Sequence, residues 1–289
     1  MSRARAWPSR LVLLGHPLGH TLSPAIHGAA LRSAGIGAEY RALDVPPHAL
    51  PETLEALIAE RAAGNVTIPH KGAVAARCDR LTDVARRAGA VNTFWCEDGA
   101  LVGDNTDVGG FDASVRALLE VAPPAARVGV IGAGGAAGAV LAAIDGWPQS
   151  EARVWNRTPE RADALVSRFP RAARAASLDD ALDGATLVVN ATSLGLRDDA
   201  LPVPIDALPR DAAVLDLVYR PGETSWVRAA RAAGHRASDG LPMLVEQAAL
   251  AEERWFDVAA DREAMWGAVG GRPEWMRSAA NPRRWSCAT

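Results

Sequence analysis

An apolar strand that runs directly into a glycine-rich turn and an alanine-rich helix constrains this chain more than any other feature. The strand is Arg127–Ile131, and the helix after the turn extends to Asp145. The turn contains the small residues Gly132, Gly134, Gly135 and Ala136. With a strand before it and a helix after it, a glycine-rich turn is in the context that binds a dinucleotide. The glycines let the backbone approach the pyrophosphate, which is held at the helix N-terminus. We therefore predict a Rossmann-type nucleotide-binding domain.

The segment after the next strand indicates which dinucleotide is bound. That strand ends at Trp155 and is followed by Asn156, Arg157 and Thr158. A site for NAD needs an acidic residue here to hold the ribose 2′-hydroxyl, and none is present. Arg157, with Arg161 behind it, suits a 2′-phosphate instead, which predicts NADP. The competing interpretation is a solvated face, because arginine is abundant in this chain.

A single lysine is the second constraint. Lys71 is the only lysine among 31 basic residues, and it closes the stretch Asn65–Lys71. An ammonium can change its protonation state on burial whereas a guanidinium stays charged, so arginine cannot replace lysine at a proton-transfer site. The expected strand Gly64–Ile68 places Lys71 just past its C-terminal end, where open α/β sheets place their ligands. The alternative is a surface lysine that has simply survived.

Other polar residues of the first half also stand at strand ends or helix starts. Thr21 and Ser23 precede a helix expected from Pro24 to about Ala34, with Ser23 as its N-cap. The free N–H groups of a helix start suit a substrate carboxylate, although Ser23 could serve as a cap alone. Four further polar residues are more than capping requires: Asn65, Asn92, Thr106 and Asp107.

Strand and helix patterns continue along the chain. In the first half we expect strands at Leu11–Leu14, Glu39–Val45, Ala90–Cys96 and Ala100–Gly103, and helices at Pro51–Ala63, Thr82–Ala88 and Phe111–Val121. In the second half we expect strands at Thr186–Asn190 and Ala213–Leu217, and helices at Thr224–Ala233 and Leu241–Phe256. Tyr219 follows a strand end, so its hydroxyl is expected to face a cleft. Gln247, on the same helix face as Met243, is by default a solvated glutamine.

Composition indicates a globular protein of about two domains, with no sign of nucleic-acid or membrane binding. The chain has 289 residues, of which 49% are hydrophobic and 22% charged, and its net charge is −3. The first apolar run, Leu11–Leu14, is too short for a signal sequence or a membrane span. Cys78, Cys96 and Cys287 lack metal-ligand spacing and are interpreted as reduced thiols, so we expect a cytoplasmic protein.

Taken in order, these motifs resemble the shikimate dehydrogenase family from about Leu11 to Ala268. Besides the glycine-rich turn, the matching stretches are His20–Pro24, Asn65–Lys71, Gly89–Thr93, Asn105–Asp107, Asn156–Thr158, Asn190–Gly195 and Gly240–Gln247. The resemblance implies an α/β fold with an N-terminal three-layer α/β substrate domain (1–107 and 241–289) and an NADP-binding Rossmann domain (108–240). It places the active-site cleft between them and implies the reversible reduction of 3-dehydroshikimate to shikimate.

The resemblance also implies roles for individual residues. Lys71 and Asp107 would be the catalytic pair. The substrate carboxylate would be held by Thr21, Ser23 and Tyr219, and its hydroxyls by Asn65, Thr67, Asn92, Asp107 and Gln247. The cofactor would be bound by Gly132, Gly134, Gly135, Ala136, Asn156, Arg157, Thr158, Arg161, Thr192, Ser193, Val218, Gly240 and Met243. From the residues themselves we expect no metal, because the scattered histidines form no ligand set and Lys71 supplies the positive charge. We expect His20 and His70 to be packing groups or groups that support the binding residues, and not bases.

The sequence departs from the family pattern at three positions. Thr21 replaces the usual serine, Gly28 stands where asparagine often follows the histidine, and Pro242 is unusual before Met243. The extra methyl group of Thr21 changes discrimination by only about 1–3 kcal/mol. The family resemblance therefore survives, while a preference for quinate or an amino analogue stays open.

The expected mechanism follows from charge. Hydride transfer to a ketone leaves negative charge on its oxygen, which needs a proton and a nearby positive donor. A lysine is protonated at neutral pH, and a carboxylate nearby favours that charged form. We therefore expect Lys71 to donate the proton in the reductive direction, and we expect alkaline pH to assist oxidation.

Other functions stay open. A quinate or aminoshikimate-type dehydrogenase would use the same site. A regulator that binds NADP or shikimate without turnover would need neither Lys71 nor Asp107, and both are present. A third possibility combines the Rossmann half with a different partner domain, as in folate-linked dehydrogenases, but it leaves the Asn65–Lys71 stretch unexplained. We expect a monomer or homodimer. Its tail, with Trp275 and Trp285, either docks on the body or on a second subunit, or is a disordered end.

Overall fold

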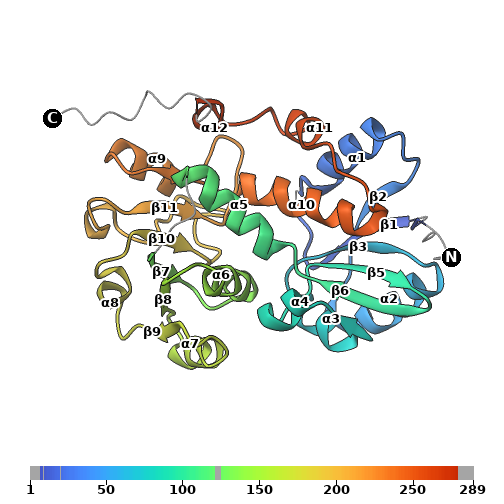
Figure 1. Ribbon diagram of the computed structural model, residues 1–289, viewed down its shortest axis with the longest axis horizontal. Helices are drawn as coiled ribbons and strands as arrows, with labels where there is room; N and C mark the ends of the chain where they lie inside the picture. The colour runs from blue at the N-terminus through green and yellow to red at the C-terminus, as the bar shows by residue number, and fades with distance from the viewer. Residues whose placement is uncertain (1–6, 9, 20, 121–124, 279–289) are drawn as a thin grey trace.

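The computed structural model describes residues 7, 8, 10–19, 21–120 and 125–278. Two α/β bodies, each built on a six-stranded sheet, are joined through the central helices α5 (Asp107–Leu119) and α10 (Leu241–Phe256) (Figure 1). The expectations for His20, Trp285 and Cys287 lie outside the described residues.

The N-terminal body contains a mixed sheet with the strand order β2-β1-β3-β5-β6-β4. Strand β5 runs antiparallel to β3 and β6, and the remaining pairs are parallel. The strands are β1 (Arg10–Gly15), β2 (Glu39–Asp44), β3 (Ala63–Val66), β4 (Arg80–Leu81), β5 (Thr93–Glu97) and β6 (Ala100–Asp104). The helices are α1 (Ser23–Ser33), α2 (Leu50–Ala59), α3 (Lys71–Arg77) and α4 (Asp83–Ala88), with a 3₁₀ turn at Pro47–Ala49.

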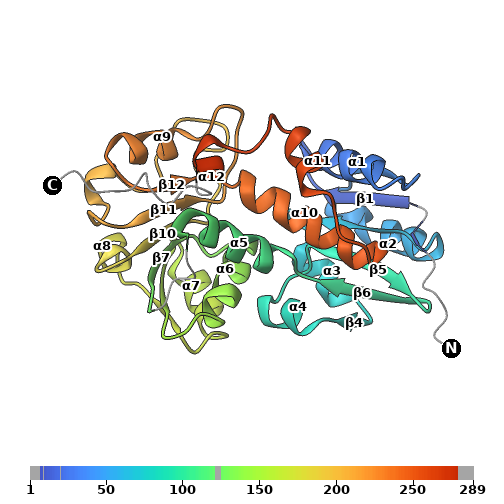
Figure 2. The ribbon, with the colours of Figure 1, turned by 45° about the horizontal axis from the view of Figure 1, so that its top comes forward.

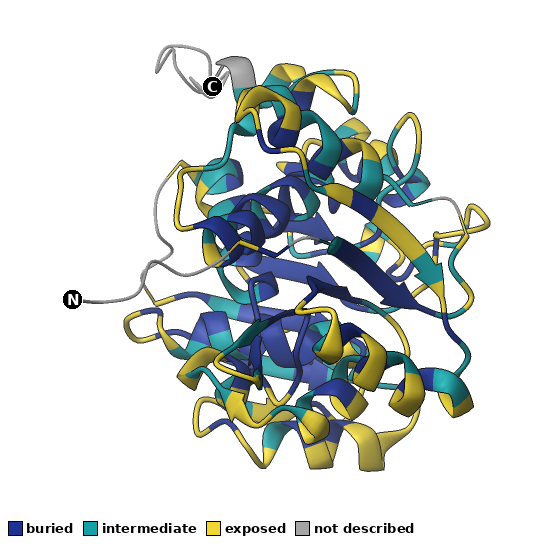
Figure 3. Cartoon of the chain, turned by 90° about the vertical axis from the view of Figure 1, so that its right-hand side faces the viewer, coloured by how far each residue is buried: buried dark blue, intermediate teal, exposed yellow. Residues whose placement is uncertain are grey.

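Strand β1 explains why helices cover this sheet on both faces. Leu11 and Leu13 belong to the core under α1 and α10, whereas Val12 and Leu14 belong to the core under α2, α3 and α4. A strand that is apolar on both faces requires cover on both. The predicted three-layer arrangement is confirmed, with buried central strands between helices whose outer surfaces are exposed (Figure 3).

The second body contains a parallel sheet with the strand order β12-β11-β10-β7-β8-β9. Its strands are β7 (Arg127–Ile131), β8 (Glu151–Trp155), β9 (Ala172–Arg174), β10 (Leu187–Asn190), β11 (Ala213–Asp216) and β12 (Ala237–Ser238). Its helices are α6 (Gly135–Asp145), α7 (Pro159–Val166), α8 (Leu178–Leu182) and α9 (Ser225–Ala232), with a 3₁₀ turn at Ile205–Ala207. This is the doubly wound Rossmann order, whose ligands bind at the carboxyl ends of the strands where the order reverses, between β7 and β10.

Helices α5 and α10 lie side by side between the two sheets (Figures 1 and 2). A Cβ atom on Gly110 would lie 2.9 Å from the backbone oxygen of Met243, so glycine is needed for this close approach. Near the end of α10, Trp255 Nε1 donates to Thr93 Oγ1 at 3.0 Å and anchors the helix to the first sheet. The chain then forms α11 (Arg262–Gly267) and α12 (Glu274–Ser278). Among the described helices, none has the length and apolar character needed to span a bilayer.

Two predicted helices have wrong boundaries. The helix predicted at Phe111–Val121 begins at Asp107. Two glycines lower the helix propensity of its first turn, so the sequence did not predict this start. Packing against α10 stabilises the turn. The helix predicted at Pro51–Ala63 ends at Ala59, and Arg61 then takes a left-handed conformation with φ of 55°. The other predicted elements are present, with ends that differ by a few residues.

Candidate active site

Lys71 and Asp107 form an ion pair where the N-terminal body meets the central helices. Lys71 opens α3 and Asp107 opens α5, and Lys71 Nζ donates to Asp107 Oδ2 at 2.5 Å. The two side chains are only 15% and 9% exposed, so solvent screens the pair weakly. A helix N-terminus disfavours a cation. Asp107, and not the dipole of α3, therefore stabilises the ammonium here.

Asn92 fixes the orientation of Asp107. Asn92 Nδ2 donates to Asp107 Oδ1 at 2.9 Å and lies 3.2 Å from Gln247 Oε1. Asn92 Oδ1 accepts the backbone N–H of Thr106 at 2.7 Å. Gln247 is only 8% exposed, so the default interpretation of a solvated glutamine is wrong. Packing of α10 on α5 turns that side chain into the cluster.

Asn65 and Thr67 lie at the end of β3, beside this cluster. Asn65 Nδ2 donates to the backbone oxygen of Asn92 at 3.3 Å, and Asn65 Oδ1 accepts from the Tyr40 hydroxyl at 2.8 Å. The methyl group of Thr67 packs over Gly15. Within the residues that the structure describes, the Thr67 hydroxyl makes no hydrogen bond, so it is available to a ligand. Tyr40 was not predicted as a functional residue, because its only signal in the sequence is an aromatic side chain in an alternating strand.

Thr21, Ser23 and Tyr219 gather at the start of α1. Leu22 is the N-cap and no side chain caps the helix, so the prediction that Ser23 is the N-cap is wrong. Thr21 Oγ1 accepts the Ser23 N–H at 3.2 Å and lies 3.3 Å from Ser23 Oγ. Burial raises the pKa of Tyr219, and its contact with Thr21 opposes that rise. Tyr219 therefore keeps its phenolic proton, which can be donated to a carboxylate.

The glycine-rich turn faces Lys71. A Cβ atom on Gly135 would lie 3.9 Å from Lys71 Cδ, so the turn and the lysine are neighbours. Gly132 has φ of +110°, and a Cβ atom there would lie 2.8 Å from the methyl group of Thr192. Both observations require glycine at position 132. The segment containing Gly134, Gly135 and Ala136 supplies the free N–H groups at the start of α6. These N–H groups fit the pyrophosphate of a dinucleotide.

Asn156 joins the glycine-rich turn to the loop after β8. Its Oδ1 accepts the backbone N–H of Ala133 at 3.1 Å, and its Nδ2 donates to the backbone oxygen of Thr158 at 2.8 Å. Arg157 and Arg161 are exposed, and neither has an ion-pair partner among the described residues. Two unpaired guanidinium groups beside a pyrophosphate turn fit the 2′-phosphate of NADP.

Two buried strand-end residues hold the loops that carry Thr192 and Val218. Asn190 Oδ1 accepts the Thr192 N–H at 3.0 Å, and Asp216 Oδ1 accepts the Val218 N–H at 3.1 Å. Asn190 Nδ2 donates to Asp216 Oδ1 at 2.8 Å, and burial raises the pKa of Asp216. Asp216 was not predicted as a functional residue, because its only signal in the sequence is that of one acid closing an apolar strand. The other predicted cofactor residues are exposed Ser193, and buried Gly240 and Met243 around the start of α10.

Comparison with known proteins decides the family. Residues 13–94 match the family model of the shikimate dehydrogenase substrate binding domain, and residues 240–269 match that of the shikimate 5'-dehydrogenase C-terminal domain. Over 258 residues the chain is 45% identical to the shikimate dehydrogenase (NADP(+)) of Methylobacterium radiotolerans, covering 86% of this chain and 91% of that protein. This chain belongs to the shikimate dehydrogenase family. The predicted resemblance is therefore confirmed.

Two solved structures place the fold in the shikimate dehydrogenase family as well. A shikimate dehydrogenase from Aquifex aeolicus matches with a TM-score of 0.85 and 32% identity, over 90% of this chain and 97% of that one. A shikimate 5-dehydrogenase from Thermus thermophilus, in complex with NADP(H) and shikimate, matches with a TM-score of 0.79 and 42% identity. That match covers 93% of this chain and 99% of that one.

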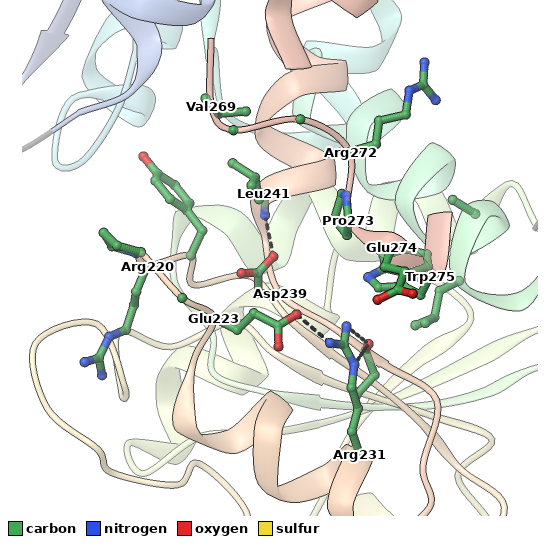
Figure 4. Close-up of a pocket in the computed structure, with 18 of the residues that line it drawn as sticks. Arg220, Glu223, Arg231, Asp239, Leu241, Val269, Arg272, Pro273, Glu274 and Trp275 are labelled. Carbon is green, nitrogen blue, oxygen red and sulfur yellow. Dashed lines mark hydrogen bonds and ion pairs between the residues drawn. The ribbon is translucent and has the colours of Figure 1, made fainter. Parts of the chain in front are cut away.

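A cavity of about 970 Å³ adjoins the candidate active site beside Tyr219. It lies between the loop after β11, the start of α10 and the segment 269–275 (Figure 4). In its wall, one carboxylate oxygen of Asp239 accepts the Leu241 N–H at 3.1 Å, and Glu223 pairs with Arg231. Burial raises the pKa of Asp239 to about 6.

Asp239→Asn is expected to stabilise the protein by at most about 3 kcal/mol at pH 8 and to have little effect near pH 4. Because burial raises the pKa of this carboxyl from 3.8 to about 6, the group binds its proton more tightly in the folded state than in the unfolded state. Its ionisation therefore costs stability above pH 6, and this cost disappears as the pH falls toward 3.8. Denaturant unfolding at both pH values measures the difference, with exposed Asp206→Asn as the control. An equal effect of Asp239→Asn at both pH values would contradict this reasoning.

The thiols of the N-terminal body are not reactive centres. Burial raises the pKa of Cys78 to about 12 and also raises that of Cys96, so both thiols stay protonated. Within the described part of the chain, no group of three or more His, Cys, Asp and Glu side chains is placed to hold a metal ion.

Proposed function

We propose that this protein catalyses the reversible reduction of 3-dehydroshikimate to shikimate with NADP as its cofactor. The observation that carries the proposal is the Lys71–Asp107 ion pair lying beside Gly135 of the glycine-rich turn. Carbonyl reduction requires a proton donor and a hydride donor to be held together in one geometry. The names of the family relatives, among them the Thermus protein in complex with NADP(H) and shikimate, support the same reaction.

In this proposal, NADPH supplies the hydride when it is bound. Lys71, held as an ammonium by Asp107, donates a proton to the carbonyl oxygen as negative charge develops there. Asn92 keeps the carboxylate of Asp107 turned toward the lysine. In the oxidative direction Lys71 must first lose its proton to accept one from the substrate hydroxyl, so alkaline pH assists oxidation.

We assign the two ends of the substrate to the two groups of polar side chains around this pair. The hydroxyls at the start of α1 and after β11 would hold the carboxylate: Thr21, Ser23 and Tyr219. The amide and hydroxyl groups on the other side would hold the substrate hydroxyls: Asn65, Thr67, Asn92 and Gln247. Arg157 and Arg161 would bind the 2′-phosphate of the cofactor.

The proposal also covers the domain boundaries, the cellular location and the oligomeric state. Residues 1–107 and 241–289 would form the substrate domain and residues 108–240 the cofactor domain, with the active-site cleft between them. Support comes from the two separate sheets, since one lies within residues 10–104 and the other within residues 127–238. We place the protein in the cytoplasm as a monomer or homodimer that binds small molecules, without a nucleic-acid or membrane partner.

A substrate panel at fixed NADPH tests the reaction. Loss of NADPH absorbance should be fast with 3-dehydroshikimate and slow with 3-dehydroquinate or an amino analogue. The second candidate is a quinate or amino-analogue preference, which the extra methyl group of Thr21 at the carboxylate end leaves open, and faster turnover of either analogue would establish it. Binding of NADP and shikimate without any turnover would overturn the enzymatic proposal in favour of a regulator.

A further inference from the structure

Tyr40 is a buried phenol that none of the assignments above uses. It lies on β2 and is 7% exposed. Its hydroxyl donates to Asn65 Oδ1 at 2.8 Å, although β1 separates their strands in the sheet. The hydrogen bond fixes which side of the Asn65 amide is oxygen, so Asn65 Nδ2 is left as the donor side. An amide held this way offers an N–H, and not an oxygen, to a ligand.

The hydroxyl of Tyr40 keeps the proton that it donates to Asn65. Burial and the charge of Glu252 raise the pKa of Tyr40 well above its ordinary value.

The ring of Tyr40 is fixed by stacking. His27 stacks on it with a centroid distance of 4.2 Å and an interplanar angle of 16°, and the Trp255 ring lies 5.2 Å from that of His27. His27 Nδ1 lies 2.8 Å from Glu252 Oε1, whereas the buried His27 Nε2 has no partner among the described residues. The proton of a neutral His27 therefore belongs on Nδ1, where it binds the imidazole to Glu252. A fixed ring holds the phenol oxygen at one point.

We propose that Tyr40 is a positioning residue for substrate binding, which fixes the orientation of the Asn65 amide through its hydroxyl. The inference rests on the proposed function, because that function assigns Asn65 to the substrate. Without the hydroxyl, Asn65 Oδ1 is left buried and unpaired, and the amide loses the contact that fixes its orientation. Residues that orient ligand-binding groups affect binding although they do not touch the ligand.

Tyr40→Phe is expected to raise the KM for shikimate roughly tenfold, to leave kcat within about threefold and to leave the KM for NADP unchanged. Phenylalanine keeps the ring that stacks on His27, so the variant removes little besides the hydroxyl. Ser114→Ala is the matched control, because it deletes another buried hydroxyl, which donates to the backbone oxygen of Gly110 at 2.8 Å. The control is expected to keep both KM values.

A double-mutant cycle with Asn65→Ala separates positioning from general destabilisation. If Tyr40 acts through Asn65, Tyr40→Phe should raise the KM for shikimate much less in the Asn65→Ala background than in the wild type. An unchanged KM in Tyr40→Phe, a fully additive cycle, or an equal rise in Ser114→Ala would each overturn the inference. Wild-type protein that neither binds nor oxidises shikimate would instead overturn the proposed function, and this inference with it.

Discussion

Lys71→Ala is expected to lower kcat by at least about a hundredfold in both directions, while the KM for shikimate stays nearly unchanged. Positioned general acid–base catalysis contributes roughly 10²–10⁴-fold, and Lys71 is the cation paired with Asp107 beside the glycine-rich turn. The substrate carboxylate and hydroxyls are assigned to other side chains, so binding should survive. Steady-state kinetics with shikimate and NADP measures both parameters.

Two further variants separate the lost proton donor from other effects of this change. Lys71→Met fills similar space without a charge, so it should lose as much turnover as Lys71→Ala. Arg77→Ala removes an exposed cation from the other end of α3 and should keep normal kinetics. Near-normal turnover in Lys71→Ala would remove this residue from the mechanism.

Arg157→Asp is expected to lower the preference for NADPH over NADH by at least roughly 30-fold, which corresponds to about 2 kcal/mol. The substitution deletes a guanidinium that fits the 2′-phosphate and adds a carboxylate that repels it. The same carboxylate can accept a hydrogen bond from the 2′-hydroxyl of NADH, which is the arrangement in NAD sites. The ratio of kcat/KM for the two cofactors, measured with 3-dehydroshikimate, reports the change.

A matched charge reversal elsewhere controls for long-range electrostatics. Arg210→Asp changes an exposed arginine of the same body by the same charge and should leave the ratio unchanged. An unchanged ratio in Arg157→Asp would contradict the assignment of the 2′-phosphate to this side chain.

The strongest local patterns predicted the fold well. Strand β7 and helix α6 lie at their predicted positions because an apolar strand, a glycine turn and an alanine-rich helix agree on one structure. The helix Leu241–Phe256 also has its predicted ends. The start of α5 could not be predicted, because its first turn depends on packing of Gly110 against α10, far along the chain.

The candidate site was predictable as a set of residues but not as a network. Polar residues at strand ends identified Asn92 and Asp107, whereas the family resemblance supplied their roles. The contact of Gln247 with Asn92 depends on how α10 returns across the molecule, which helix periodicity alone does not reveal. The link from Tyr40 to Asn65 reaches across β1, and only the strand order brings those two side chains together.

The most direct test of the central assignment is the distance from Lys71 Nζ to the reacting oxygen in a crystal structure with NADP⁺ and shikimate bound. We expect the nitrogen to lie about 2.6–3.2 Å from the shikimate hydroxyl that faces the nicotinamide ring, with Asp107 on its other side. A structure in which Lys71 points away from that hydroxyl, and another side chain contacts it instead, would contradict the account.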